Sequence, residues 1–231
     1  STGLGHRRVR GLMPFGRLVI PDERDANYPL RAFMAQAAPV VDRTSRTWFG
    51  NGWWGNQGST SMCVGYSWAH WLEDGPVTQK GTSPIVEPQR IYAEAQKIDD
   101  WPGEGYDGTS VRAGAKVLQT LGFIESYHWA QTMDDAVAAL LVVGPVVFGT
   151  NWYGDMMSPD SKGFIKPTGA VVGGHAYVVD GINTKTRLAR IKNSWGRGWG
   201  KYGYAFISID DLAGLLREDG GEACLAIEVM K

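Results

Sequence analysis

The order of local patterns most constrains the fold of this chain, because helical patterns fill its first half and strand patterns follow from Pro145. Four segments with helical spacing or capping residues start near Cys63, Glu87, Thr109 and Thr132. Beyond Pro145 the apolar segments are short, rich in β-branched and aromatic residues, and separated by Gly, Asn and Asp. Helices followed by strands indicate an α+β protein, and we expect two lobes with a cleft between them.

Local signals predict several boundaries within this pattern. Thr132 with Asp135 resembles a capping box, and the Gly-Pro pair at 75–76 should end the helix that starts at Cys63. A short helix is expected over residues 209–217, among the strands. The expected strands lie in "PVVFGTN", "HAYVVDGIN", "LARIKNSW", "YAFISI" and "ACLAIEVM".

Composition excludes several functional classes. The 231 residues suit one medium domain or two closely packed lobes, and a net charge of -1 gives no general reason to expect a nucleic acid or an anionic membrane as partner. No run approaches the roughly 18 apolar residues that span a bilayer. The first twenty residues carry four arginines (Arg7, Arg8, Arg10 and Arg17) and no acid, so we expect a solvated, mobile basic arm.

The cysteine and histidine counts bear on compartment and metal binding. Cys63 and Cys224 are the two cysteines, which is too few for a disulfide framework and fits a reducing compartment. No signal peptide is visible, although processing could have removed one, so secretion stays open. Four scattered histidines and two distant cysteines lack metal-ligand spacing, and we expect neither a metal nor an organic cofactor.

Three separated segments place residues suited to thiol chemistry. Cys63 stands where a helix begins, six residues after Gln57 in a Gly/Ser/Thr loop. His175 is expected to begin a strand after two glycines, and Asn193 follows another strand. A helix N-terminus and an imidazolium can lower the pKa of a thiol by several units, which predicts a thiolate–imidazolium pair.

The remaining polar groups fit the same chemistry. His175 could donate its proton to a departing amine, and the side-chain carbonyl of Asn193 could orient the imidazole ring. The Gln57 amide and the backbone N–H of Cys63 could donate to a developing oxyanion. Trp195 could exclude water from the His–Asn hydrogen bond.

Structural roles compete with these interpretations. Cys63 taken alone fits a small buried apolar residue, and Cys224 in a terminal apolar strand is expected in the core. His70 is expected to be a partly exposed helical residue, and His128 to lie in a Tyr-His-Trp turn. The adjacent tryptophans at 53–54 are expected to pack rather than to bind substrate.

The blocks "NQGSTSMC", "GGHAYVVDG" and "IKNSWGRGWGKYGY" resemble the three signature blocks of papain-like cysteine peptidases, in the same order. The segment "VVDRTSRTW" also resembles a family motif, so the similarity covers residues 40–231. It implies a papain-like two-lobe fold, with a helical lobe, an antiparallel β-barrel-like lobe and the active site between them. Residues 1–36 would be an N-terminal extension or a pro-segment remnant, and 37–231 the peptidase domain, with lobes at about 50–130 and 131–231.

The resemblance also implies roles for individual residues. Cys63 would be the nucleophile, His175 the general acid/base, Asn193 its orienting partner and Gln57 an oxyanion donor. Trp195 would cover the His–Asn pair and Trp199 would line the leaving-group side. Gly108 or Thr109 would hold the substrate backbone, and Gly174 would border a roomy pocket for the second residue before the scissile bond. Peptides or proteins would be substrates, and a pro-segment or protein inhibitor could occupy the cleft.

Departures from the family pattern and rival activities stay open at this point. Thr60 stands where many secreted members have a disulfide cysteine, and "GGHA" is more similar to bacterial, archaeal or phage members. The same thiol could serve an acyl transferase, a transpeptidase or a cell-wall peptide hydrolase. A non-catalytic module that only binds peptides is a further alternative.

Overall fold

The structure, a computed structural model, describes residues 15–19, 23, 27, 29–37, 42–77, 83–101 and 105–229. In these ranges the α-helices are α1 (Leu30–Ala37), α2 (Cys63–Asp74), α3 (Pro88–Gln96), α4 (Val111–Thr120), α5 (Met133–Val142) and α6 (Ile209–Arg217). The strands are β1 (Ser45–Thr47), β2 (Ile124–Trp129), β3 (Val146–Tyr153), β4 (Val171–Asn183), β5 (Leu188–Lys192), β6 (Tyr204–Ser208) and β7 (Glu222–Glu228), and one 3₁₀ helix, η2, covers Gly154–Met157. The α+β class expected from the sequence is confirmed.

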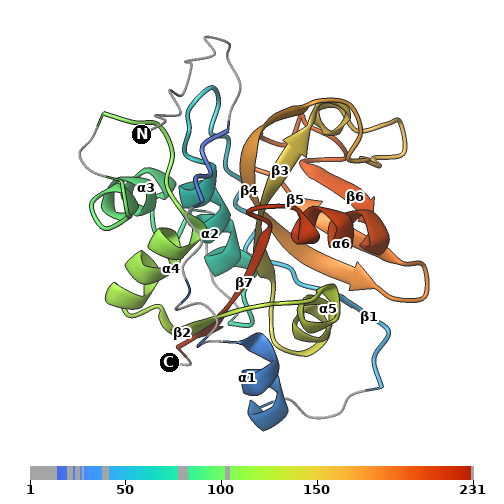
Figure 1. The fold of residues 1–231 in the computed structure, drawn as a ribbon, viewed down its shortest axis with the longest axis horizontal. Helices are drawn as coiled ribbons and strands as arrows, with labels where there is room; N and C mark the ends of the chain where they lie inside the picture. Colours follow the sequence, from blue (N-terminus) through green and yellow to red (C-terminus); the bar gives the residue numbers. More distant parts are fainter. Residues whose placement is uncertain are drawn as a thin grey trace, which may run out of the picture.

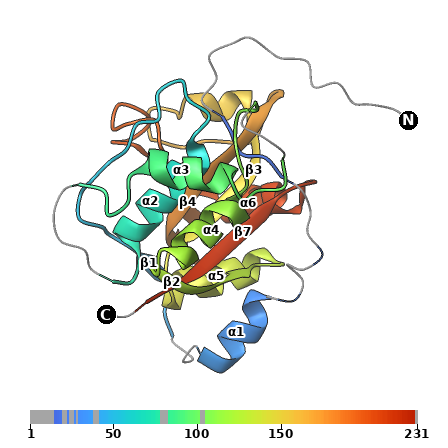
Figure 2. The same cartoon turned by 90° about the vertical axis from the view of Figure 1, so that its left-hand side faces the viewer.

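All seven strands belong to one antiparallel sheet, in the order β2-β7-β3-β4-β5-β6 with β1 paired to β4. Helices α2, α3 and α4 gather on one side of the molecule, whereas β3 to β6 and α6 form the other (Figure 1). Strand β7 runs between them and continues the sheet toward β2 (Figure 2). Helix α2 packs directly against β4, so these two elements join the helical and the strand-rich halves.

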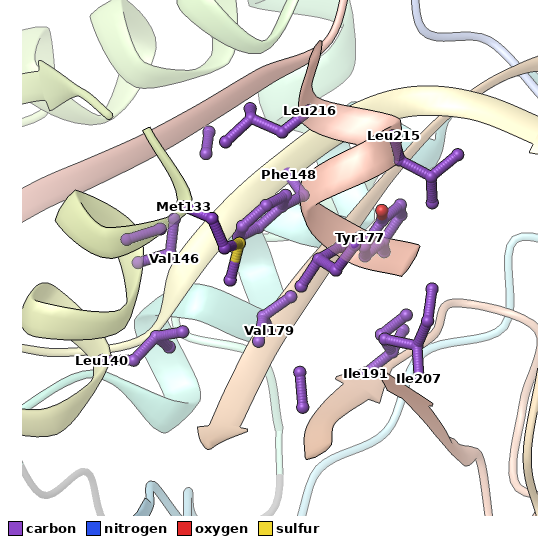
Figure 3. Packing of buried hydrophobic residues seen from close by; sticks show 14 of the residues in the cluster. Met133, Leu140, Val146, Phe148, Tyr177, Val179, Ile191, Ile207, Leu215 and Leu216 are labelled. Carbon is purple, nitrogen blue, oxygen red and sulfur yellow. The ribbon is translucent and has the colours of Figure 1, made fainter. Parts of the chain in front are cut away.

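Two hydrophobic clusters share the central strands. Phe148 of β3 and Tyr177 of β4 face the cluster formed with α5 and α6, which Figure 3 shows. The residues adjacent to them in sequence, Val147 before Phe148 and Val178 after Tyr177, face the cluster formed with α2, α3 and α4. Successive side chains in a strand point to opposite faces, so both faces of β3 and β4 are buried. This burial explains why these strands read as nearly continuous apolar runs.

The five helices that the sequence predicted after residue 60 are present as α2 to α6, with α6 at the predicted 209–217. Ser110 caps α4, because its hydroxyl accepts the N–H of Ala113 at 3.1 Å. Thr132 and Asp135 form the predicted capping box of α5. Gly75 is the C-cap residue of α2, as the Gly-Pro signal indicated.

Other local predictions were wrong. His175 lies inside β4 and does not begin it, because Gly174 and the residue before it are extended and paired with β3. His128 belongs to β2 rather than to a turn, since pairing with β7 holds it extended. Helix α1 and strand β1 lacked a sequence signal, because their stability comes from contacts with distant elements such as α5 and β4.

Within the described residues, no helix has both the length and the apolar content needed to cross a membrane. The division of the chain at residue 36, and of its lobes near residue 130, stays a prediction.

Candidate active site

Cys63 is the first residue of α2 and is completely buried. The residue before it, Met62, provides no side-chain cap to the helix. The backbone N–H groups of the first turn therefore point toward the thiol region without a capping side chain, which creates positive potential there. The thiol also lies within hydrogen-bonding reach of the N–H of Ala176, which follows His175 in β4. Contact between α2 and β4 thus brings Cys63 of the N-terminal half close to the region of His175 in the C-terminal half.

His175 is also completely buried, and its orientation is set by Asn193. The ring Nε2 lies 2.8 Å from Oδ1 of Asn193, which directly follows β5. The same oxygen accepts the backbone N–H of Ser194 at 2.8 Å, which identifies it as an acceptor. Nε2 therefore carries the proton, and Nδ1 is the unprotonated nitrogen of the neutral ring.

Aromatic rings enclose this imidazole. The ring centroids of Trp152 and Trp195 lie 4.8 and 4.9 Å from that of His175. Trp199 extends the group, with its ring 5.5 Å from that of Trp195. Among the described residues, Nδ1 of His175 has no hydrogen-bond partner, although it is buried. An unsatisfied buried polar atom is uncommon and needs an explanation.

Gln57 is tied to the same loop as Asn193. Its Oε1 accepts the hydroxyl of Ser194 at 2.5 Å, and its backbone N–H donates to the carbonyl of Ser194 at 2.8 Å. The side-chain Nε2 donates to the carbonyl of Thr60 at 2.7 Å. These contacts fix which end of the amide is the donor, and they direct Nε2 toward the loop that leads into α2.

Residues 15–19, here named the covering segment, lie over the site. The N–H of Arg17 donates to the carbonyl of Gly174 at 3.2 Å. On the helical side, Thr109 donates to the carbonyl of Gly16 at 2.9 Å and accepts the N–H of Leu18 at 2.9 Å. The covering segment therefore bridges the two halves through backbone hydrogen bonds, as an extended peptide ligand would.

Side chains of the covering segment exclude solvent from the catalytic candidates. The ring of Phe15 contacts those of His175 and Trp195 edge-on, at centroid distances of 5.8 and 6.1 Å. A Cβ on Gly173 would lie only 2.6 Å from the Phe15 ring. Glycine at this position therefore makes room for the phenyl group.

Burial sets the protonation states of the covered site. It raises the pKa of the Cys63 thiol to about 12, although the N–H of Ala176 and the charge of Arg17 act in the opposite direction. It lowers the pKa of His175 to about 4, although the hydrogen bond that its ring donates to Asn193 acts in the opposite direction. Burial therefore favours the neutral form of both groups in the covered site. The thiolate–imidazolium pair stays a prediction.

Arg17 is buried, which corrects the prediction of a solvated basic arm at this residue; the arginines at 7, 8 and 10 lie outside the described residues. Its Nε donates to Oε1 of Glu222 at 3.0 Å, and the two side chains are 4% and 16% exposed. Burial raises the pKa of Glu222, while the charges of Arg17 and Arg112 lower it. The charge pair explains why an arginine tolerates this location.

Of the residues predicted to contact substrate, three contact the covering segment, whereas Trp199 contacts Met157 and Trp195. Gly108 and Thr109 both lie beside Gly16, and a Cβ on Gly108 would be 2.4 Å from the Gly16 carbonyl oxygen. Gly174 contacts Arg17 through its carbonyl oxygen. Trp199 instead donates its indole N–H to the carbonyl of Met157 at 2.8 Å and lies behind Trp195.

His70, the tryptophans at 53–54 and Cys224 lie outside the site, and the sequence predicted surroundings for each of them. His70 is completely buried, not partly exposed, and its Nε2 accepts the N–H of Gly55 at 3.0 Å. Its ring lies beside those of Trp53 and Trp54, which pack on it. Cys224 is buried in the core, and neither cysteine forms a disulfide. Over the described ranges, no group of three or more histidines, cysteines and acids could hold a metal ion.

Sequence reasoning missed four residues of the site. Ser194 links Gln57 to Asn193, and the motif "NSW" that contains it was a usable signal. Arg17 and Glu222 are separated by 205 positions, and no local pattern relates them. Phe15 likewise carries no signal beyond being apolar.

The model of the papain family of cysteine proteases matches residues 52–216, which is more than half of the chain. The chain belongs to the papain family. The matched range contains Cys63, His175 and Asn193 in the order that the sequence blocks indicated.

Solved structures of this family share the fold. Xylellain, a cysteine protease from Xylella fastidiosa, superposes with a TM-score of 0.75 at 22% identity and covers 99% of this chain and 100% of its own. A digestive procathepsin L proteinase from Tenebrio molitor larval midgut gives a TM-score of 0.60 at 17% identity, covering 93% of this chain and 78% of its own. The papain-like two-lobe fold expected from the sequence is confirmed.

A relative is also known from a virus. An uncharacterized peptidase C1-like protein of Acanthamoeba polyphaga mimivirus is 24% identical over 198 residues. The match covers 64% of this chain and 62% of the viral protein, so the chain spans less than two thirds of that relative.

Proposed function

We propose that this chain is a cysteine peptidase that hydrolyses peptide bonds through a thioester on Cys63. One observation carries the proposal. His175 is held by Asn193 through Nε2, while its buried Nδ1 has no partner among the described residues and the thiol lies at the adjacent start of α2. Nδ1 is then the atom that exchanges a proton with Cys63, which explains why it lacks another partner.

The proposed reaction uses each group in turn. The Cys63 thiol transfers its proton to Nδ1 of His175, and the thiolate attacks the substrate carbonyl carbon. The Gln57 amide and the N–H of Cys63 stabilise the oxyanion, and the imidazolium then protonates the departing amine. Water, deprotonated by His175, attacks the thioester and releases the acid. Asn193 keeps the ring in the required orientation throughout.

We further propose that residues 1–36 form an extension that inhibits residues 37–231, the peptidase domain, through the covering segment. The hydrogen bonds of Thr109 and Gly174 with this segment are ones a substrate backbone would need, and Phe15 and Arg17 exclude water. The Gly16 carbonyl accepts the N–H of Thr109, so its donor is not one of the two proposed oxyanion donors, the Gln57 amide and the Cys63 N–H. The procathepsin similar to this chain is likewise a proform. Trp199, which lies behind Trp195, would support the leaving-group side of the site.

Labelling of the thiol tests the proposed activity. The full chain and its Cys63→Ala variant are incubated under reducing conditions with an epoxysuccinyl inhibitor of thiol proteases, and intact mass is measured. We expect the adduct only where Cys63 is present, and faster on the Arg17→Ala chain than on the wild type because its covering segment is weakened. The Arg17→Ala chain should hydrolyse a fluorogenic peptide, and Cys63→Ala should not. The proposal is contradicted if neither the wild type nor the Arg17→Ala variant, each folded and reduced, gains an adduct on Cys63 or cleaves the peptide.

The rival activities give different outcomes. An acyl transferase or transpeptidase would pass the acyl group to an added amine rather than to water, which product analysis separates. A cell-wall peptide hydrolase would cleave muropeptides in preference to ordinary peptides. A module that only binds peptides would show equal turnover for wild type and Cys63→Ala. The intact set of Gln57, Cys63, His175 and Asn193 favours hydrolysis.

A further inference from the structure

His70 is a buried histidine of α2 that the proposed reaction does not use. It follows Cys63 by seven residues, about two helical turns, so the two side chains lie on the same face of α2. Its Nε2 accepts the backbone N–H of Gly55 at 3.0 Å. Gly55 stands two positions before Gln57, one of the two proposed oxyanion donors. His70 therefore connects the helix that carries the thiol to the segment that carries Gln57.

Residues 55–57, here named the oxyanion segment, lie between α2 and the loop that follows β5. The carbonyl of Gly55 accepts the N–H of Gly196 at 3.3 Å, which ties the segment to that loop. On the other side, a Cβ on Gly55 would lie only 2.4 Å from the ring of Tyr66, which belongs to α2. The oxyanion segment is therefore held from two sides, and its contact with the helix is close.

The surroundings of His70 argue against a role in packing alone. The side chain is completely buried, and its ring centroid lies 5.0 and 5.7 Å from those of Trp53 and Trp54. Its Nδ1 has no hydrogen-bond partner among the described residues. A buried imidazole with one unsatisfied nitrogen is less favourable than an apolar side chain of similar size. An apolar residue, however, would leave the N–H of Gly55 without its acceptor.

The contact with Gly55 requires a neutral imidazole. Nε2 can accept a hydrogen bond only when it carries no proton, so the proton of the neutral ring is on Nδ1. Burial lowers the pKa of His70 well below its usual value, and the charge of Lys192 acts in the same direction. Nε2 is therefore available as an acceptor at neutral pH.

We propose that His70 is a positioning residue for the oxyanion site: by holding Gly55 against α2, it places the Gln57 amide relative to the thiol and the N–H of Cys63. The inference rests on the proposed peptidase function. Donors stabilise an oxyanion only when they point at the place where the charge develops, and a displacement of about 1 Å can reduce the rate about 100-fold. His70 acts through Gln57 and does not itself contact the substrate.

The experiment uses the full chain carrying Arg17→Ala and Cys224→Ala, and compares three replacements of His70. In His70→Gln the side-chain oxygen can take the place of Nε2 and accept the N–H of Gly55. The oxygen of His70→Asn overlies Nδ1 instead, and His70→Leu has no acceptor. We measure kcat and KM with a fluorogenic peptide, alkylation of Cys63 by iodoacetamide, and urea denaturation. Alkylation forms no oxyanion, so its rate reports the thiol alone.

The replacements should separate into two groups. We expect His70→Leu and His70→Asn to lower kcat about 10- to 100-fold, with KM and the alkylation rate changed by less than about threefold. His70→Gln should keep kcat within about threefold of the parent chain, because it restores the acceptor. His128→Gln is the matched control, since the ring of His128, on β2, stacks on Phe33 away from the oxyanion segment. It should leave kcat and alkylation unchanged.

A double-mutant cycle tests whether His70 acts through Gln57. Gln57→Ala removes an oxyanion donor and should lower kcat by roughly 100- to 1,000-fold. Adding His70→Leu to Gln57→Ala should lower kcat by less than about a further threefold, because the donor that His70 positions is already absent. A full 10- to 100-fold loss in both backgrounds would show that His70 acts independently of Gln57, and would overturn the inference.

The remaining outcomes distinguish this inference from the proposed function. Unchanged kcat in all three variants, or parallel losses of kcat and alkylation, overturns the role of His70 while the peptidase stands. If His70→Leu fails to fold, the contrast between His70→Gln and His70→Asn decides, and equal kcat for these two overturns the inference. Failure of both His70→Leu and His70→Asn to fold assigns His70 to the fold and overturns it as well. A parent chain with neither turnover nor Cys63 labelling overturns the peptidase function, and this inference with it.

Discussion

Two buried ion pairs join residues that are far apart in the sequence, and they differ in the kinds of segment that they connect. Nζ of Lys192, on β5, lies 2.6 Å from Oδ1 of Asp74, on α2, and the side chains are 3% and 2% exposed. Nε of Arg17 lies 3.0 Å from Oε1 of Glu222, with side chains 4% and 16% exposed. The first pair connects a helix and a strand, whereas the second connects a strand to a segment without regular structure.

The surroundings decide what each pair can do. Asp74 ends a helix that is buried along its whole length, and Lys192 is at the buried end of β5, so neither charge can reach water without disrupting the fold. Arg17 belongs to a segment held by a few hydrogen bonds to Thr109 and Gly174, and the proposed function requires that segment to leave while the sheet stays intact. A buried charge pair therefore has a structural role in one place and a reversible one in the other.

The largest effect is expected from the pair between β5 and α2. Lys192→Met should lower the free energy of unfolding by about 3–5 kcal/mol, because it leaves the Asp74 carboxylate buried beside Asp180 without its cation. Urea denaturation measures the change. The double variant with Asp74→Asn should recover much of the loss, and a loss below about 1 kcal/mol for the single variant would contradict a structural role.

A pH profile tests the covered state of the thiol. With Cys224 replaced by Ala, alkylation of Cys63 by iodoacetamide in the otherwise wild-type chain should rise about tenfold per pH unit from pH 8 to 10. The thiolate fraction grows in this way below a pKa of about 12. A plateau between pH 6 and 9 would instead indicate a thiolate already formed beside an imidazolium.

Weakening the second pair should uncover the site with little effect on the fold. Arg17→Ala removes the contact with Glu222 but keeps the backbone hydrogen bonds, so we expect the alkylation rate of Cys63 at pH 7 to increase about tenfold. The free energy of unfolding should change by less than about 1 kcal/mol. A loss of several kcal/mol with unchanged thiol reactivity would show that both pairs serve the fold.

The smallest change in the free energy of unfolding is expected for an ion pair at the surface, which serves as a reference for the buried pairs. Arg187 pairs with Asp210, and their side chains are 57% and 72% exposed. Arg187→Met should change the free energy of unfolding by no more than about 0.5–1 kcal/mol, since water screens the pair. If Arg187→Met lowered the free energy of unfolding as much as Lys192→Met, burial would not explain the difference in stability between the two ion pairs.

Much of the fold was predictable because its signals are local. The capping box at Thr132 and the helix over Ile209–Arg217 depend on neighbouring residues, and both are present. Strand β2 and the interior position of His175 in β4 were missed, because pairing with distant strands holds these residues extended. Glycines that read as strand breakers are compatible with a paired strand when another segment covers them.

By itself the sequence determined the α+β class, the helix that starts at Cys63 and the set of Gln57, His175 and Asn193 that surrounds a candidate thiol. Each of these depends on residue type and on spacing along the chain. Only the tertiary structure decided that residues 15–19 cover that thiol, that burial raises its pKa, and that Arg17 reaches Glu222. Exclusion of water and contact across 205 positions are properties of the packed molecule, and a linear pattern does not encode them.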